Sequence, residues 1–256
     1  MMYVELNISA GKVAAADTRL FQLQAAENMT VLDLLEGLRS GHGQAFPAYR
    51  HSCHHGSCGT CGAVINGVPA LMCLSSLGSL QEQAGSLESS PPATVPGSSP
   101  ESPLHLKLEP LPGFVRIAGL AVKPVDLFEN IPAGLDYLMP ADDRDRENLP
   151  FLDASEAGCQ GSSCRVRFEQ CIECGLCQAA CPVQEAFIGP AALAAVNRQI
   201  LKKPDTATSW LAVAAAENGA GACRRHLLCS RVCPQAVYPA KHIQLLKNRI
   251  GRQPAD

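Results

Sequence analysis

The chain of 256 residues, 46% of them hydrophobic, is long enough for two modest domains or one large one. Its 21 basic and 24 acidic side chains give a formal net charge of −3 without a long basic run, which argues against nucleic acid as a partner. The sequence has neither a secretory leader nor the roughly 18 consecutive apolar residues of a membrane-spanning helix, so we expect a cytoplasmic chain without a transmembrane segment of its own.

The first part of the chain has the pattern of a small sheet with one helix. Residues 3–8 and 19–24 are short, partly alternating runs that predict strands. Residues 30–39 carry apolar side chains at helical spacing. Thr30 and Asp33 have the pattern of a capping box, so we expect the helix to begin there.

A hairpin, another strand and an insertion are expected next. Asn66-Gly67 stands between two apolar runs and predicts a two-residue β-hairpin. Residues 104–111 alternate again and predict a strand. The segment 81–103 is rich in Ser, Pro, Gly and Glu and has little apolar content, so we expect a flexible insertion on the surface.

The second part of the chain predicts helices and no parallel sheet. Pro190 marks one helix start, and Asn218-Gly219 marks one helix end. No Gly-rich dinucleotide loop or phosphate loop is present in the sequence, so we expect no flavin or nicotinamide cofactor bound by this chain itself. Helices are expected over residues 191–203, 206–217, 223–232 and 240–250.

The 13 cysteines are too many for chance in a cytosolic chain, where reducing conditions favour metal ligands over disulfides. The first group has the spacing C-x4-C-x2-C followed by a later fourth cysteine, which is the plant-type ferredoxin pattern for a 2Fe-2S cluster. The alternatives are a four-cysteine zinc site and a Rieske-like centre with His54 or His55 as ligands. The expected 2Fe-2S ligands are Cys53, Cys58, Cys61 and Cys73.

Two later runs have the pattern of a two-cluster ferredoxin. CIECGLCQAACP is a C-x2-C-x2-C-x3-C-P run, in which the fourth cysteine binds the cluster of the partner run. The partner run, CRRHLLCSRVCP, has the spacing C-x5-C-x3-C-P and so lacks one cysteine. This exchange predicts a 4Fe-4S cluster and a three-thiolate 3Fe-4S cluster, with iron bound through these cysteines. The 4Fe-4S ligands are Cys171, Cys174, Cys177 and Cys233, and the 3Fe-4S ligands are Cys181, Cys223 and Cys229.

His226 stands where the missing cysteine of the second run would be. Three roles are open: a filler that leaves the cluster with three irons, a carrier of protons, or a ligand. We favour the filler. Cys159 and Cys164 fit neither pattern, and we interpret them as structural or solvent-facing thiols, with a ligand or redox role as the alternative.

The motifs RHSCHHGSCGTCG, INGVPALMC, LEPLPGF, CIECGLCQAACP and CRRHLLCSRVCP, in this order, resemble the iron–sulfur subunits of succinate dehydrogenase and fumarate reductase. The resemblance implies an α+β chain of two domains. Residues 1–112 would form a plant-type 2Fe-2S ferredoxin domain of the β-grasp type. Residues 113–256 would form an α-helical ferredoxin domain that carries the 4Fe-4S and 3Fe-4S clusters.

The resemblance also implies partners and an activity. An FAD-containing flavoprotein subunit would interconvert succinate and fumarate, and a membrane anchor subunit would supply quinone or menaquinone and can bind heme. This chain would be the oxidoreductase subunit that relays single electrons between them, peripheral on the cytoplasmic face of the inner membrane. The alternatives are the same relay serving a soluble or thiol-linked flavoprotein reductase of another unsaturated acid, and a zinc-stabilised interaction module.

The sequence departs from the family pattern at the expected quinone site. Members that react with quinone commonly have a tryptophan pair after the Cys-Pro of the first run, whereas this chain has CPVQEAFIG and its single tryptophan at Trp210. Members also often have histidine where this chain has Arg224. Pro182, Arg224 and His226 are expected to border a quinone site.

Overall fold

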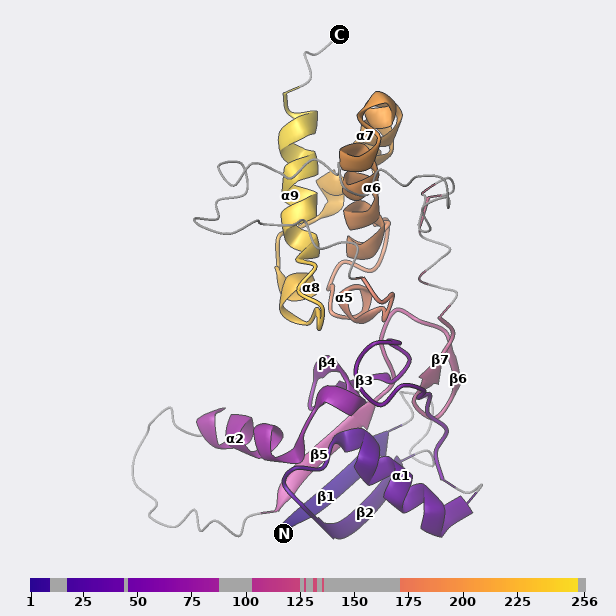
Figure 1. Ribbon diagram of the computed structural model, residues 1–256, viewed down its shortest axis with the longest axis vertical. Coiled ribbons are helices and arrows are strands. Elements are labelled where there is room, and N and C mark those ends of the chain that lie inside the picture. Colours follow the sequence, from indigo (N-terminus) through magenta and orange to yellow (C-terminus); the bar gives the residue numbers. More distant parts are fainter. Residues whose placement is uncertain are drawn as a thin grey trace. The chain divides into compact units, whose positions relative to one another are not determined.

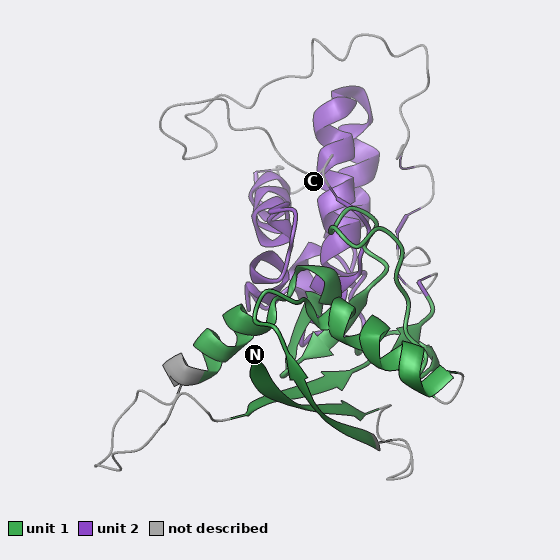
Figure 2. Cartoon of the chain, turned by 60° about the horizontal axis from the view of Figure 1, so that its bottom comes forward, with its two compact units in different colours: residues 1–123 green, residues 124–256 purple. Residues whose placement is uncertain are grey.

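The computed structural model describes residues 1–9, 18–43, 46–87, 103–124, 127, 131–132, 135 and 171–252. The chain divides into two compact units, Met1–Lys123 and Pro124–Asp256, which Figure 2 shows in different colours. This division lies after the boundary expected at residue 112, because a short hairpin of β6 (Arg116–Ala118) and β7 (Ala121–Val122) belongs to the first unit. The amide of Leu120 in this hairpin donates a hydrogen bond of 2.8 Å to the carbonyl of Ala48.

The first unit is built on a five-stranded sheet with the order β2-β1-β5-β3-β4. The central strand β5 pairs in parallel with β1, and every other pair in this sheet is antiparallel. The expected strands and the Asn66-Gly67 hairpin are confirmed. The strands are β1 (Met2–Ser9), β2 (Thr18–Ala25), β3 (Gly62–Ile65), β4 (Val68–Leu71) and β5 (Leu104–Glu109).

The core of this unit lies between the sheet and helix α1 (Val31–His42), which crosses the sheet in Figure 1. Alternate residues of β1 and β5 are fully buried, as a half-buried strand requires. The expected capping box is confirmed, because Asp33 N donates to Thr30 Oγ1 at 3.1 Å and Thr30 N donates to Asp33 Oδ2 at 2.9 Å. This cap fixes the start of α1.

Helix α2 (Leu77–Leu87) corrects one expectation about the insertion. Residues 81–87 are helical and do not belong to a flexible segment. Leu77 is fully buried and its amide donates to Met29 O at 2.9 Å, which anchors the helix start, and the following Gln and Glu residues favour helix. The remainder of the expected insertion, residues 88–102, lies outside the described residues.

The second unit is helical where it is described. Its two longest helices, α6 and α9, lie side by side, with the short α5 and α8 at one end of the pair (Figure 1). Apolar side chains of α6, α7 and α9 form its core, including Leu193, Val196 and Leu246. The helices are α5 (Leu176–Ala179), α6 (Pro190–Lys202), α7 (Ala207–Ala215), α8 (Leu228–Arg231) and α9 (Pro239–Ile250).

The helix expected over residues 223–232 is wrong for its first half. Only α8 is helical there, and the stretch before it is a loop in which Arg225 and Leu227 have φ of 60° and 63°. These left-handed conformations are incompatible with a right-handed helix, so the helix can begin only after Leu227.

The α+β class is confirmed, with a β-grasp sheet in the first unit and helices in the second. Among the residues that the structure describes, no helix is both long enough and apolar enough to cross a membrane.

Candidate iron–sulfur sites

The first cysteine group lies on a loop and on one turn beside the β3–β4 hairpin. Cys53 and Cys58 are in the loop that leads to β3, Cys61 directly precedes β3, and Cys73 lies in a 3-10 turn, Met72–Leu74, directly after β4. The hairpin brings its two ends together, so the Sγ atoms of Cys61 and Cys73 are 3.3 Å apart. Local β-pairing therefore places the distant fourth thiol beside the loop.

Backbone amides point at the thiol of Cys53. The N–H groups of His55, Ser57 and Cys58 lie 3.5, 3.3 and 3.4 Å from its Sγ atom. Hydrogen bonds to this thiol, from the backbone of His55 first and then from Ser57 and Cys58, lower the pKa of Cys53 to about 5. A thiolate is the form that binds iron, and the same amides stabilise the negative charge of thiolate-bound iron and sulfide.

Cys61 has the opposite environment. Burial is the main cause that raises its pKa to about 12, and the charge of the neighbouring Cys73 contributes to this rise. A buried thiol of this kind is protonated until a metal displaces the proton, so binding of iron here releases protons.

Glycine is required at one point of the loop. Gly56 has φ of 80°, and a Cβ atom there would lie 2.8 Å from the side chain of Leu74. Leu74 follows Cys73, so this close approach packs the cysteine loop against the turn that holds the fourth thiol. Gly59 also has a positive φ, of 70°, whereas Gly62 begins the regular strand β3.

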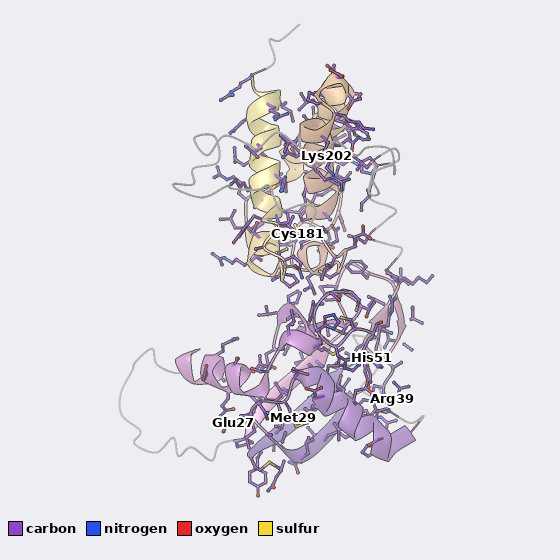
Figure 3. All side chains as sticks on the ribbon, viewed as in Figure 1. Glu27, Met29, Arg39, His51, Cys181 and Lys202 are labelled. Carbon is purple, nitrogen blue, oxygen red and sulfur yellow. The ribbon has the colours of Figure 1, made fainter. Side chains whose placement is uncertain are left out.

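A polar network joins the cysteine loop to α1. Glu36 Oε1 accepts a 2.5 Å hydrogen bond from Tyr49 and lies 3.2 Å from His51 Nε2, while the Arg39 guanidinium lies 5.8 Å from the centre of the Tyr49 ring. Burial, together with the bond to Glu36, raises the pKa of Tyr49 to about 12. Arg39 and His51 are labelled in Figure 3. His51 Nδ1 is in turn 3.1 Å from His54 Nε2, so the network reaches the residue that follows Cys53.

In the second unit, the four cysteines of one predicted set surround a hollow, which we call the Cys171 hollow. Ala191 and Ala194 of α6, Glu173 and Val237 also line it. Burial, with smaller contributions from the charges of Cys171 and Cys233, raises the pKa of Cys174 to about 12. Burial raises the pKa of Cys177 well above the ordinary value, and the charges of Cys174 and Cys171 act in the same direction. The cysteines that line the hollow are Cys171, Cys174, Cys177 and Cys233.

A second hollow, the Cys181 hollow, is lined by Cys181, Cys223 and Cys229. Burial, with smaller contributions from the charges of Cys181 and Cys223, raises the pKa of Cys229 to about 11. Cys181, labelled in Figure 3, lies between the ends of α5 and α8. Pro182, Arg224 and His226 line the same hollow, and Arg224 and His226 are exposed. The structure thus brings together the thiols that the spacing had paired, with Cys233 beside the first run and Cys181 beside the second.

The N-terminal ends of α6 and α9 meet at these two hollows. Pro190 and Ala240 line the Cys181 hollow, and Ala191 and Pro239 line the Cys171 hollow. Both helices exceed ten residues and direct the positive ends of their dipoles at the thiols, which favours a group of net negative charge there.

The thiol sets suit clusters of several irons. In the part of the chain that the structure describes, no three His, Cys, Asp or Glu side chains converge on a point that one metal ion could fill. The thiolates that bind a multi-iron cluster are bonded to different iron atoms and so lie apart from one another. The cysteines that line each hollow are placed apart in this way.

Cys159 and Cys164 lie outside the described residues. Sequence reasoning missed Arg198, a buried arginine on the face of α6 that adjoins the Cys171 hollow.

Comparison with known families agrees with both halves of this description. A family model described as a 2Fe-2S iron-sulfur cluster binding domain matches residues 9–129, and one described as a 4Fe-4S dicluster domain matches residues 167–237. The fold and the three thiol sets define an iron–sulfur electron-transfer protein with a ferredoxin-like unit at each end.

Relatives of known name identify the family. The chain is 30% identical to the fumarate reductase iron-sulfur subunit of Mycobacterium tuberculosis, over 95% of this chain and 90% of that protein. It is 27% identical to the succinate dehydrogenase iron-sulfur subunit of Coxiella burnetii, over 89% and 86%. The chain belongs to the family of fumarate reductase and succinate dehydrogenase iron–sulfur subunits. It is therefore an electron-relay subunit of an oxidoreductase complex, with 2Fe-2S, 4Fe-4S and 3Fe-4S clusters.

A solved structure shares the fold. The Mycobacterium smegmatis Sdh1 complex in the apo form contains a chain that matches this one with a TM-score of 0.65 and 21% identity, over 100% of this chain and 98% of that one.

Proposed function

We propose that this subunit relays single electrons between the FAD of a flavoprotein subunit and a quinone or menaquinone at a membrane anchor. The 2Fe-2S cluster is bound by the first cysteine group, the 4Fe-4S cluster by the Cys171 hollow and the 3Fe-4S cluster by the Cys181 hollow. One observation carries the proposal: each hollow in the second unit draws thiols from both cysteine runs. Two clusters held in this way lie close together in one unit, which suits an electron path.

The chemistry of the complex calls for such a chain. Succinate oxidation moves two electrons to a flavin at once, whereas iron–sulfur centres accept one at a time. The dicarboxylate chemistry takes place on the flavoprotein, and this chain accepts and passes the electrons in the order 2Fe-2S, 4Fe-4S, 3Fe-4S. Exposed Arg224 and His226 border the 3Fe-4S end together with Pro182, so quinone would react there. The subunit would lie on the cytoplasmic face of the inner membrane, held through its complex.

One observation favours a second candidate, in which the same relay serves a soluble or thiol-linked flavoprotein reductase of another unsaturated acid. Gln184 stands in the segment where quinone-reactive members commonly have a tryptophan pair. Its side-chain amide donates to the carbonyls of Gln178, at 3.2 Å, and of Cys181. A glutamine turned toward the backbone offers no aromatic surface to a quinone ring.

Low-temperature EPR of the purified native complex tests the relay. We expect a 3Fe-4S signal in the oxidised sample and a 2Fe-2S signal after dithionite reduction. The same preparation should contain a membrane subunit with quinone or heme. A complex with all clusters but no membrane subunit would favour the second candidate, and an oxidised sample without a signal would contradict the three-iron assignment.

Replacement of His226 with cysteine should convert the 3Fe-4S centre toward 4Fe-4S, because a fourth thiolate at the hollow can hold a fourth iron. Iron analysis and the loss of the oxidised EPR signal measure the conversion. His226→Ala is the matched control and should retain three irons. If the wild type instead contains four irons at this site and His226→Ala loses one, the histidine is a ligand.

A further inference from the structure

One face of α6 carries small residues and then a buried arginine. Ala191 and Ala194 line the Cys171 hollow, and Ala195 packs in the cluster that includes Cys171 and Cys233. Arg198 lies four residues after Ala194 and three residues after Ala195, which places it on the same face of the helix. Its side chain is only 4% exposed. The arginine therefore brings a charge to the same helix face that lines the hollow.

The buried guanidinium acts on groups of the cluster loop. Arginine stays protonated in proteins, so Arg198 is a fixed positive charge. Ala194 and Ala195, one turn before it, pack in the cluster that also includes Cys171 and Cys233, and Glu173 lines the same hollow as Ala194. The loop that carries Cys171 is therefore within reach of this charge.

We propose that Arg198 sets the reduction potential of the cluster held in the Cys171 hollow by stabilising its reduced form. Reduction adds one electron, and so one negative charge, without making or breaking a bond. The electron comes from the 2Fe-2S centre, and no proton is needed. A buried positive charge stabilises that added negative charge more strongly than an exposed one would, because the surroundings screen it less. The inference rests on the proposed assignment of the 4Fe-4S cluster to this hollow.

This role has a consequence for the relay. In the proposed electron path, the 4Fe-4S centre lies between the 2Fe-2S and 3Fe-4S centres. Its reduction potential therefore decides how readily it accepts an electron. Charge, hydrogen bonding and burial around a cluster determine that potential. Arg198 lies on a helix outside both cysteine runs. Its positive charge makes the 4Fe-4S centre easier to reduce.

The test is an EPR-monitored redox titration of the intact complex with Arg198→Met. We expect the midpoint potential of the 4Fe-4S centre to fall by an amount equivalent to about a tenfold change in its reduction equilibrium, about 59 mV for one electron. The 2Fe-2S and 3Fe-4S potentials should stay at their wild-type values. Arg198→Lys retains the charge and should stay close to wild type.

Lys202→Met is the matched control. Lys202 ends α6 (Figure 3), one turn beyond Arg198 and about 6 Å further along the helix axis, and its replacement removes the same charge. Equal shifts in Arg198→Met and Lys202→Met, or an unchanged potential in Arg198→Met, would overturn the inference. If Arg198→Met does not assemble, Arg198→Gln and Arg198→Lys are compared, and equal potentials in that pair overturn it. Absence of a 4Fe-4S centre from the wild type would overturn both the assignment and the inference, whereas wild-type signals with an unmoved potential would overturn the inference alone.

Discussion

A Cys233→Ala chain is expected to lose its 4Fe-4S cluster and to retain its 3Fe-4S cluster. The thiol of Cys233 lines the Cys171 hollow, and its charge acts on Cys171, Cys174 and Cys177. The amide of Val237 donates to its Sγ atom at 3.3 Å, which fixes the thiol in that position. Iron and sulfide analysis with EPR of the oxidised and reduced complex measures the loss.

Cys229→Ala is the matched control for this experiment. Cys229 belongs to the same run as Cys233 but lines the Cys181 hollow, so its replacement should remove the oxidised 3Fe-4S signal. Each run could instead bind its own cluster without exchange. In that case Cys233→Ala and Cys229→Ala would both remove the 3Fe-4S signal, and the crossed assignment would be wrong.

Gly189→Ala is expected to destabilise the second unit by about 3 kcal/mol. Gly189 precedes α6 with φ of 96° and ψ of 162°, a conformation that residues with a Cβ atom avoid. A Cβ atom there would also lie 2.0 Å from the side-chain oxygen of Gln178, which is buried on α5. Because α6 begins at both hollows, the same change should weaken retention of the clusters.

Chemical unfolding of the purified complex, followed by cluster absorbance and by circular dichroism, measures the effect of Gly189→Ala. Gly221→Ala serves as the control, since a Cβ atom there would meet nothing within 4 Å. We expect the control to stay within about 0.5 kcal/mol of the wild type. Equal free energies of unfolding for the two variants would show that a Cβ atom at Gly189 does not destabilise the second unit, and the prediction would be wrong.

Local signals in the sequence account for much of the first unit. The capping box of Thr30 and Asp33, the Asn66-Gly67 turn and the alternation of β1 each act within a few residues, so they could be predicted from the sequence. The parallel pairing of β1 with β5 joins segments far apart in the chain, and periodicity contains no information about which strand becomes the neighbour. The extent of α2 was missed because its anchor, the buried Leu77, lies before the polar segment.

The grouping of the cysteines around the two hollows could be expected from the sequence for a different reason. Cysteine spacing depends on the geometry of the cluster that the cysteines bind. The motif can therefore be recognised in the sequence before the fold is known. Arg198 was missed because a charged residue in a helix ordinarily reads as exposed, and only tertiary packing makes it 4% exposed. The loop before α8 was missed because positive φ at Arg225 and Leu227 has no signature in these residue types.

The crossed thiol sets also make each cluster a cross-link. In either hollow, a bound cluster ties the first cysteine run to the second across the helices between them. The cluster inserted first therefore removes most of the chain entropy that the second insertion would otherwise have to overcome. Loading of the second unit is expected to be cooperative during biosynthesis, and resistance to proteases should rise sharply with the first cluster and little with the second.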